Sequence, residues 1–227
     1  MFTTRLLAAA VTACAAFGLG AAASAVPTWL APTGLTTSGR VAAASLAVAA
    51  TGEAVAVWDR EVGSVCADQP ANPACVHVVE ARSRAAGAHE WAPPVEIARP
   101  GVGAAPQVAV DPRGDAVAVW SHDIGVDRVL QASVRTGPTG TWQEPVDLSE
   151  PATSIGAHPV ALDGTGDAIA AWADATTVRA ESRLAASGVW GSPVPLSRSG
   201  RAAPVGPSLG VDAAGDAVVA WSLSGVV

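Results

Sequence analysis

A short pattern of apolar positions recurs four times along this chain of 227 residues. Each copy consists of a glycine, an acidic residue and an apolar run that ends in tryptophan, at residues 52–58, 114–120, 166–172 and 215–221. In the second copy, Ala116, Ala118 and Trp120 alternate with Val117 and Val119, so both faces of the segment are apolar. The pattern predicts a strand that is buried on both faces.

A shorter apolar strand is predicted immediately before each copy, at residues 46–48, 108–110, 160–162 and 209–211. The turns between the two strands contain glycine, and Asp111, Asp163 and Asp212 open three of them. Each copy therefore predicts a β-hairpin.

Two further strands are predicted in each repeat. Apolar and polar residues alternate at 79–84, 130–135 and 178–183, and each of these segments ends in an arginine: Arg84, Arg135 and Arg183. Seven residues later a tryptophan opens a fourth predicted strand, at 91–98, 142–149 and 190–197. The fourth segments contain proline, which suits only an edge strand.

All eight tryptophans fall on two repeating positions. One set is Trp29, Trp91, Trp142 and Trp190, and the other is Trp58, Trp120, Trp172 and Trp221. From a member of the first set to the next member of the second, the separation is 29, 29, 30 and 31 residues. A position that is filled in every repeat indicates packing between repeats rather than a sugar-stacking site.

These features predict an all-β, β-propeller-like array of about 3.5 four-stranded antiparallel blades. The repeat units are about 41–99, 104–149, 156–198, and 204–227 taken together with 27–38. Residues 29–36 match a fourth strand, so the two ends are expected to pair and close a fourth blade. One strand is missing after Trp221. Three explanations stay open: a piece of a larger propeller, two chains that share one ring and self-associate through the unfinished blade, or a strained ring.

The first 25 residues are predicted to be a signal peptide. Arg5 precedes an apolar run at 6–19, and Ala23-Ser24-Ala25 is a small-residue cleavage site, so the mature chain is 26–227. The protein is then secreted, with cell-surface association left open, and has no membrane span after cleavage. A membrane anchor and lipidation at Cys14 are the alternatives.

The mature chain is acidic and has tryptophan as its only aromatic residue, because Phe2 and Phe17 lie in the signal and the chain contains no tyrosine. It also contains no lysine, and 20 acidic residues stand against 12 arginines, a formal charge of −8. This balance argues against nucleic acid or an anionic membrane as a partner.

The first repeat carries an insertion. Trp58 and Trp91 are 33 residues apart, against 22 and 18 in the later copies, and the excess holds Cys66 and Cys75, a predicted local disulfide. This loop is the candidate binding site for a protein or glycan, with Asp68, Gln69, Asn72 and His77 as candidate residues. A passive insertion is the alternative, and zinc at His77 would need more ligands. No cofactor or metal is predicted.

The titratable residues form no clear catalytic group. Glu53, Asp115, Asp167 and Asp216 occupy one equivalent position, which predicts turn caps rather than an unlike acid and base. Calcium between Asp111 and Asp115 is an alternative. The histidines at 77, 89, 122 and 158 follow no register and are predicted in surface loops.

The repeated Asp, Gly and tryptophan hairpins resemble the secreted bacterial propellers of the sialidase and BNR-repeat superfamily. In sialidases of this type a tyrosine nucleophile and three arginines act on the substrate. The chain has no tyrosine, and Arg84, Arg135 and Arg183 share one repeat position, so we expect them to pair with acids or cover tryptophan faces. The predicted function is a non-catalytic interaction module that binds protein or glycan through its loops. A degenerate or truncated glycosidase-like domain is the alternative.

Overall fold

The computed structural model describes residues 31–36, 39–62, 76–101, 104–198 and 204–223. Within them are 14 strands and no helix. The chain divides into residues 1–33 and 34–227, and all the strands belong to the second unit. The fold is all-β, as the alternating apolar pattern predicts.

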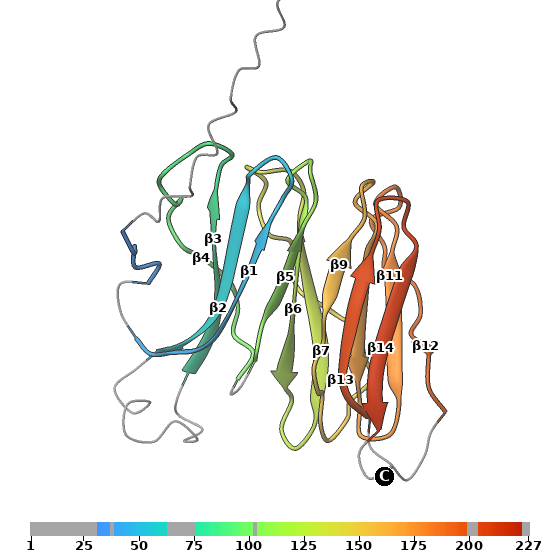
Figure 1. The fold of residues 1–227 in the computed structure, drawn as a ribbon. Coiled ribbons are helices and arrows are strands. Elements are labelled where there is room, and N and C mark those ends of the chain that lie inside the picture. Colours follow the sequence, from blue (N-terminus) through green and yellow to red (C-terminus); the bar gives the residue numbers. More distant parts are fainter. Residues whose placement is uncertain (1–30, 37–38, 63–75, 102–103, 199–203, 224–227) are drawn as a thin grey trace, which may run out of the picture. The chain divides into compact units, whose positions relative to one another are not determined.

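The strands form four antiparallel sheets, in each of which consecutive strands are neighbours (Figure 1). Sheet A is β1 (Val41–Val48), β2 (Ala54–Val62), β3 (Val76–Arg84) and β4 (Val95–Ala98). Sheet B is β5 (Gln107–Val110), β6 (Ala116–Asp123), β7 (Arg128–Arg135) and β8 (Val146–Asp147). Sheet C is β9 (Val160–Leu162), β10 (Ala168–Ala173), β11 (Val178–Arg183) and β12 (Val194–Pro195). Sheet D has two strands, β13 (Pro204–Val211) and β14 (Ala217–Leu223).

The turn that opens each sheet has one repeated geometry. In sheet B the Gly114 nitrogen donates to the Asp111 carbonyl at 3.0 Å, and the Asp111 nitrogen donates to the Asp115 carbonyl at 2.9 Å. Gly114 has a φ of 83°, a left-handed conformation that glycine adopts without strain. The Asp111 carboxylate accepts from the nitrogens of Arg113 and Asp115 at 2.8 and 2.9 Å. Asp163 and Asp212 cap the corresponding turns of sheets C and D.

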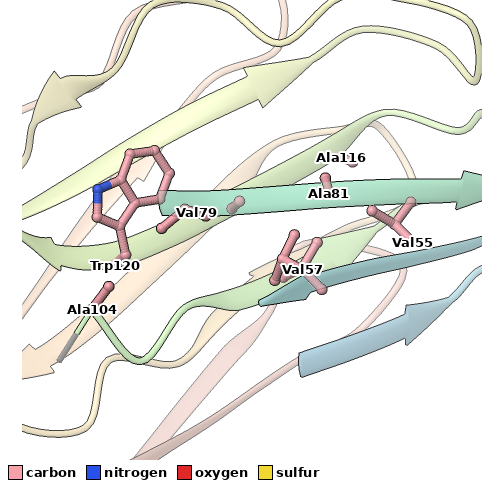
Figure 2. Packing of buried hydrophobic residues seen from close by; sticks show 9 residues of the cluster. Val55, Val57, Val79, Ala81, Ala104, Ala116 and Trp120 are labelled. Atoms are coloured by element: carbon pink, nitrogen blue, oxygen red, sulfur yellow. The ribbon is translucent and has the colours of Figure 1, made fainter. Parts of the chain in front are cut away.

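Successive sheets pack face to face through buried apolar clusters. The first cluster combines Val55, Val57 and Val79 of sheet A with Ala116, Ala118 and Trp120 of sheet B. Figure 2 shows the Trp120 indole beside the strand that carries Val79, close to Ala104. The second cluster joins sheets B and C around Trp172 in the same way. Both faces of β6 are thus covered, which explains why its residues are apolar on both sides.

The second-set tryptophans differ in burial according to their sheet. Trp58, Trp120 and Trp172 are 3%, 0% and 0% exposed, whereas Trp221 in the two-stranded sheet D is 37% exposed. Trp58 donates its indole N–H to Glu80 at 3.0 Å, and Trp120 donates to Gln131 at 3.2 Å, in each case on the adjacent third strand. Trp221 has no third strand beside it in the described part of sheet D.

The fourth strands are shorter than predicted. They begin at Val95, Val146 and Val194 rather than at the tryptophans, of which Trp142 and Trp190 form only single bridges to Arg135 and Arg183. Proline causes the difference, because it lacks a backbone donor and stands between each tryptophan and its strand. Residues 31–36, predicted to be part of a closing strand, are not in a strand.

Several predictions fall outside the described residues: the signal peptide, Cys14, Trp29, the Cys66–Cys75 disulfide, and the loop residues Asp68, Gln69 and Asn72. Within the described residues, no helix has the length and hydropathy needed to cross a membrane.

Candidate functional site

A groove of about 500 Å³ lies between the outer parts of sheets A and B. One wall is formed by residues 92–97, which lead into and include β4, and the other by residues 138–145, which connect β7 to β8. Ala81, Ser83 and Arg135 also line it. The groove is therefore built mainly from loop and edge-strand residues held by two packed sheets, which is typical of binding sites.

Trp142 and Arg135 both line the groove and contact each other. The Arg135 guanidinium carbon lies 5.8 Å from the centroid of the Trp142 ring, a cation–π distance. The two residues are also backbone neighbours through the bridge between β7 and Trp142. Trp142 remains partly exposed, so the indole is fixed in place while part of its surface lines the groove.

Arg135 is almost completely buried and strongly hydrogen-bonded. Its Nη2 lies 2.5 Å from Glu53 Oε1 and 3.0 Å from the Gly114 carbonyl oxygen, and its Nη1 donates to Ser83 Oγ. Its Nε is buried without a hydrogen-bond partner in the described structure. An unpaired buried donor costs about 1–3 kcal/mol, so Nε offsets part of the stability that the other hydrogen bonds of Arg135 supply.

The rim of the groove is acidic. Glu96 and Glu144 are exposed and line opposite walls, and Glu96 forms an exposed ion pair with Arg99 at 2.8 Å. The single arginine that lines the groove, Arg135, is neutralised by Glu53. The site therefore offers donors and acceptors without a net positive charge.

The prediction that the repeated arginines pair with acids or cover tryptophan faces is confirmed in sheets A and B. Arg84 lies over Trp91 at 5.6 Å, and Arg135 lies over Trp142 and pairs with Glu53. Arg183 is 7% exposed and forms a backbone bridge to Trp190. Each arginine serves its own sheet or the interface beside it, so the geometry gives no support to a three-arginine clamp.

Three of the four repeated acids, Glu53, Asp115 and Asp167, bind groups outside their own turns, which corrects the prediction for them. Asp115 and Asp167 instead accept from the nitrogens of Gly137 and Ala185, at 2.6 and 2.7 Å, in the loops that follow β7 and β11. Glu53, longer by one methylene, reaches the next sheet. The turn caps are the preceding aspartates, Asp111, Asp163 and Asp212. The repeated hairpin was predicted correctly, but the repeat did not show which of its acidic residues caps the turn.

His77 does not lie in a surface loop. It belongs to β3, is 3% exposed, and its Nδ1 lies 2.8 Å from Asp59 Oδ1. Burial raises the pKa of Asp59, and the hydrogen bond with His77 opposes the shift. Asp59 also accepts from the Ala104 nitrogen at 3.3 Å, which ties sheet A to the segment before β5. The sequence missed this pair because Asp59 lies just beyond the repeated apolar run.

His158 is likewise buried rather than in an exposed loop. Its Nδ1 and Nε2 lie 2.7 and 2.9 Å from the carbonyl oxygens of Gly156 and Ala105, so it links the segments before β9 and β5. Burial lowers the pKa of His158. It lines a smaller hollow of about 380 Å³ that also includes Gln107 and Ser121. His89 is exposed, as predicted, and His122 is half-buried in β6.

The structural comparison bears on the fold alone. Similarity was found to a crystal structure of a protein of unknown function from Dyadobacter fermentans, with 14% sequence identity and a TM-score of 0.55. The match covers 82% of this chain and 63% of that one, so the chain spans less than two thirds of the similar protein. No protein-family model matches the chain, and no curated protein matches it significantly. Among the described residues, no group of three or more His, Cys, Asp or Glu side chains is arranged to hold a metal ion.

Proposed function

We propose that this chain is a secreted, non-catalytic interaction module that binds a glycan or a protein through the groove between sheets A and B and its flanking loops. The observation that carries the proposal is a groove of about 500 Å³ that combines a partly exposed tryptophan, Trp142, with the exposed polar side chains of Thr141 and Gln143. Binding sites are typically concave and mainly apolar, with a few fixed polar groups. The proposed module is the predicted mature chain, 26–227.

The architecture that we propose for the module is a β-propeller-like array. Three four-stranded meanders and one two-stranded sheet follow one another in the chain, and adjacent meanders share apolar clusters. A propeller uses this type of face-to-face packing between blades. Sheet D then corresponds to a blade with two strands, and self-association through this unfinished blade is part of the proposal.

The resemblance to the sialidase and BNR-repeat superfamily supports a binding role more than a catalytic one. Two of the three arginines that could suggest a substrate clamp, Arg84 and Arg135, are engaged with Trp91, Trp142 and Glu53. A general acid and base need different environments, and the repeated acids occupy one structural position.

Secretion is tested by expressing the full chain in a secreting bacterial host and measuring the intact mass of the exported protein. The expected product begins at Val26 and is lighter by two hydrogen atoms than the reduced chain, because of the Cys66–Cys75 disulfide. Light scattering on the same sample gives the mass of the folded particle. Retention of residues 1–25 in a membrane fraction would contradict the proposal of a secreted module.

Binding through the groove is tested by screening the exported protein against arrays of glycans and extracellular proteins. Thr141→Trp is the main variant, because Thr141 is exposed and lines the groove, so a large side chain there fills the site without disturbing the core. Thr176→Trp, at an exposed site in the turn between β10 and β11, is the control. Loss of binding in Thr141→Trp alone supports the proposal, and equal binding by both variants contradicts it.

A further inference from the structure

We infer that the groove between sheets A and B binds an uncharged, hydroxyl-rich glycan chain, with Trp142 as the stacking surface and the exposed polar side chains of Thr141 and Gln143 as hydrogen-bonding groups. The inference rests on the proposed function and names the ligand class of the same site.

The apolar part of the groove suits the C–H faces of sugar rings. Trp142 packs against the cluster between sheets A and B, as its repeat position predicts, and Arg135 lies over its ring. It is only partly buried, so the exposed part of the indole lines the groove and is available for stacking. Pro93 and Pro145 stand on the two walls, and Val95 and Ile97 continue one of them. A fixed indole provides a large apolar surface with little loss of conformational entropy on binding, because the surrounding contacts already restrict its rotation.

The polar part of the groove favours an uncharged acceptor. Thr139, Thr141 and Gln143 line the groove with exposed polar side chains, which can donate to and accept from hydroxyl groups. Since Glu53 balances the guanidinium charge of Arg135, the only arginine among the lining residues offers no free positive charge to an acidic ligand.

The rim discriminates against acidic ligands. Glu96 and Glu144 face a ligand from opposite walls, and their carboxylates accept hydrogen bonds from hydroxyl groups. An anionic sugar would place a carboxylate close to these groups, where like charges repel. The groove therefore selects neutral sugars over sialic or uronic acids, unlike the substrates expected for a sialidase.

An extended proline-rich peptide is the competing ligand, because such peptides also bind aromatic-lined grooves. The lining of this groove contains a single aromatic residue, and several of its exposed side chains are polar, which suits hydroxyl groups better than proline rings. The observations favour the glycan, and a peptide serves as an arm of the test.

The experiment uses isothermal titration calorimetry on the exported full chain. The neutral probes are hexasaccharides of glucose, mannose, xylose and N-acetylglucosamine. The acidic probes are 3′-sialyllactose and trigalacturonic acid, and the peptide probe is decaproline. We expect at least one neutral hexasaccharide to bind, and the acidic probes to bind at least about tenfold more weakly.

Trp142→Ala and Trp190→Ala form the matched pair of variants. Both tryptophans follow a third-strand arginine by seven residues and bridge to it, but only Trp142 lines the groove. Trp142→Ala is expected to weaken binding at least about tenfold, and Trp190→Ala by less than about twofold. Thr141→Trp is a second blocking variant that leaves Arg135 and Trp142 in place, in case Trp142→Ala fails to fold.

Three results would overturn the inference. If no neutral hexasaccharide binds, or if the acidic probes bind as tightly, the ligand class is wrong. If decaproline binds in the glycans' place and loses affinity in Thr141→Trp, the ligand class is wrong while the proposed binding function stands. If a hexasaccharide binds equally to wild type, Trp142→Ala and Thr141→Trp, the groove is not the site, and both the inference and the proposed function fail.

Discussion

Arg135 Nη2 lies 2.5 Å from Glu53 Oε1, and this buried ion pair joins sheet B to sheet A. The two side chains are 3% and 7% exposed, and both lie beside the turn glycine Gly114. The acids at the position equivalent to Glu53 in sheets B and C are aspartates, which bind loop nitrogens of their own sheets instead. At this repeat position the longer glutamate therefore reaches an arginine of the next sheet, whereas the shorter aspartate binds a loop nitrogen of its own sheet.

Glu53→Ala should destabilise the protein by about 3–5 kcal/mol, because it leaves the Arg135 charge buried without its partner. The matched control is Asp216→Ala, since Asp216 occupies the same repeat position in sheet D and is exposed. Urea unfolding followed by tryptophan fluorescence measures both free energies. If both variants lost the same free energy of unfolding, the prediction that the Glu53–Arg135 ion pair stabilises the fold would be contradicted.

Trp120→Ala should cost about 3–5 kcal/mol, as large-to-small changes in a packed core do. Trp120 is fully buried between sheets A and B, whereas Trp221 at the equivalent position is 37% exposed. Trp221→Ala is therefore expected to cost less than about half as much. Thermal unfolding monitored by circular dichroism gives the ranking, and a larger loss for Trp221→Ala would contradict the packing described for sheet D.

Gly114→Ala should be more destabilising than Gly52→Ala. Both glycines occupy the same turn position with a positive φ, 83° and 92°, so both variants carry the backbone strain of about 1–2 kcal/mol. A methyl group at Gly114 would also meet Glu53 Oε2 and Pro138, whereas at Gly52 it would meet nothing within 4 Å. The difference between the two unfolding free energies isolates this close contact. Equal values would mean that Glu53 and Pro138 move aside without cost.

Glu181→Gln should stabilise the protein at pH 8 and have little effect below pH 5. Glu181 is 5% exposed, lies opposite Ala170 in the interior, and has a buried Oε2 without a partner among the described residues. Burial raises the pKa of Glu181 from 4.5 to about 7.

The direction of the pH effect follows from proton binding. The folded state holds the Glu181 proton more tightly than the unfolded state, so its contribution to stability is fully present below pH 4.5 and is lost as the pH rises to about 7. The loss amounts to up to about 3 kcal/mol. Urea unfolding of both proteins from pH 4.5 to 8 measures it. A constant difference between wild type and Glu181→Gln across this range would contradict the assigned shift.

Much of the strand pattern could be predicted from residue order. The third strand of sheet C runs from Val178 to Arg183 in both the prediction and the structure. Regular alternation identifies such a strand, because side chains project to opposite faces with a period of two residues. The fourth strands were predicted too long. The tryptophans mark the start of each repeated segment, but backbone pairing begins only after the prolines that follow them in the sequence.

The candidate site could be predicted only in part. The repeat located Arg135 and Trp142 and implied that arginine would cover indole, because both residues recur at fixed spacing. It could not identify the groove, which depends on residues from two sheets, such as Glu96 and Glu144, that no local pattern connects. Nor could it place His77 and Asp59 in the interior, because burial of a polar residue depends on finding a partner across strands.

The sequence by itself determined the all-β class, the hairpin turns and the repeated tryptophan positions, since these follow from backbone periodicity and from glycine at left-handed positions. Tertiary structure decided which equivalent residues are buried and what they bind. Trp120 and Trp221 have the same local sequence context, yet only Trp120 lies between two four-stranded sheets. Glu53 and Asp115 share a repeat position, yet only Glu53 reaches Arg135 across the interface. Whether a residue is buried, and which residue it pairs with, depend on the sheet that packs beside it. A repeat in the local sequence does not show how large that sheet is or which residues it presents.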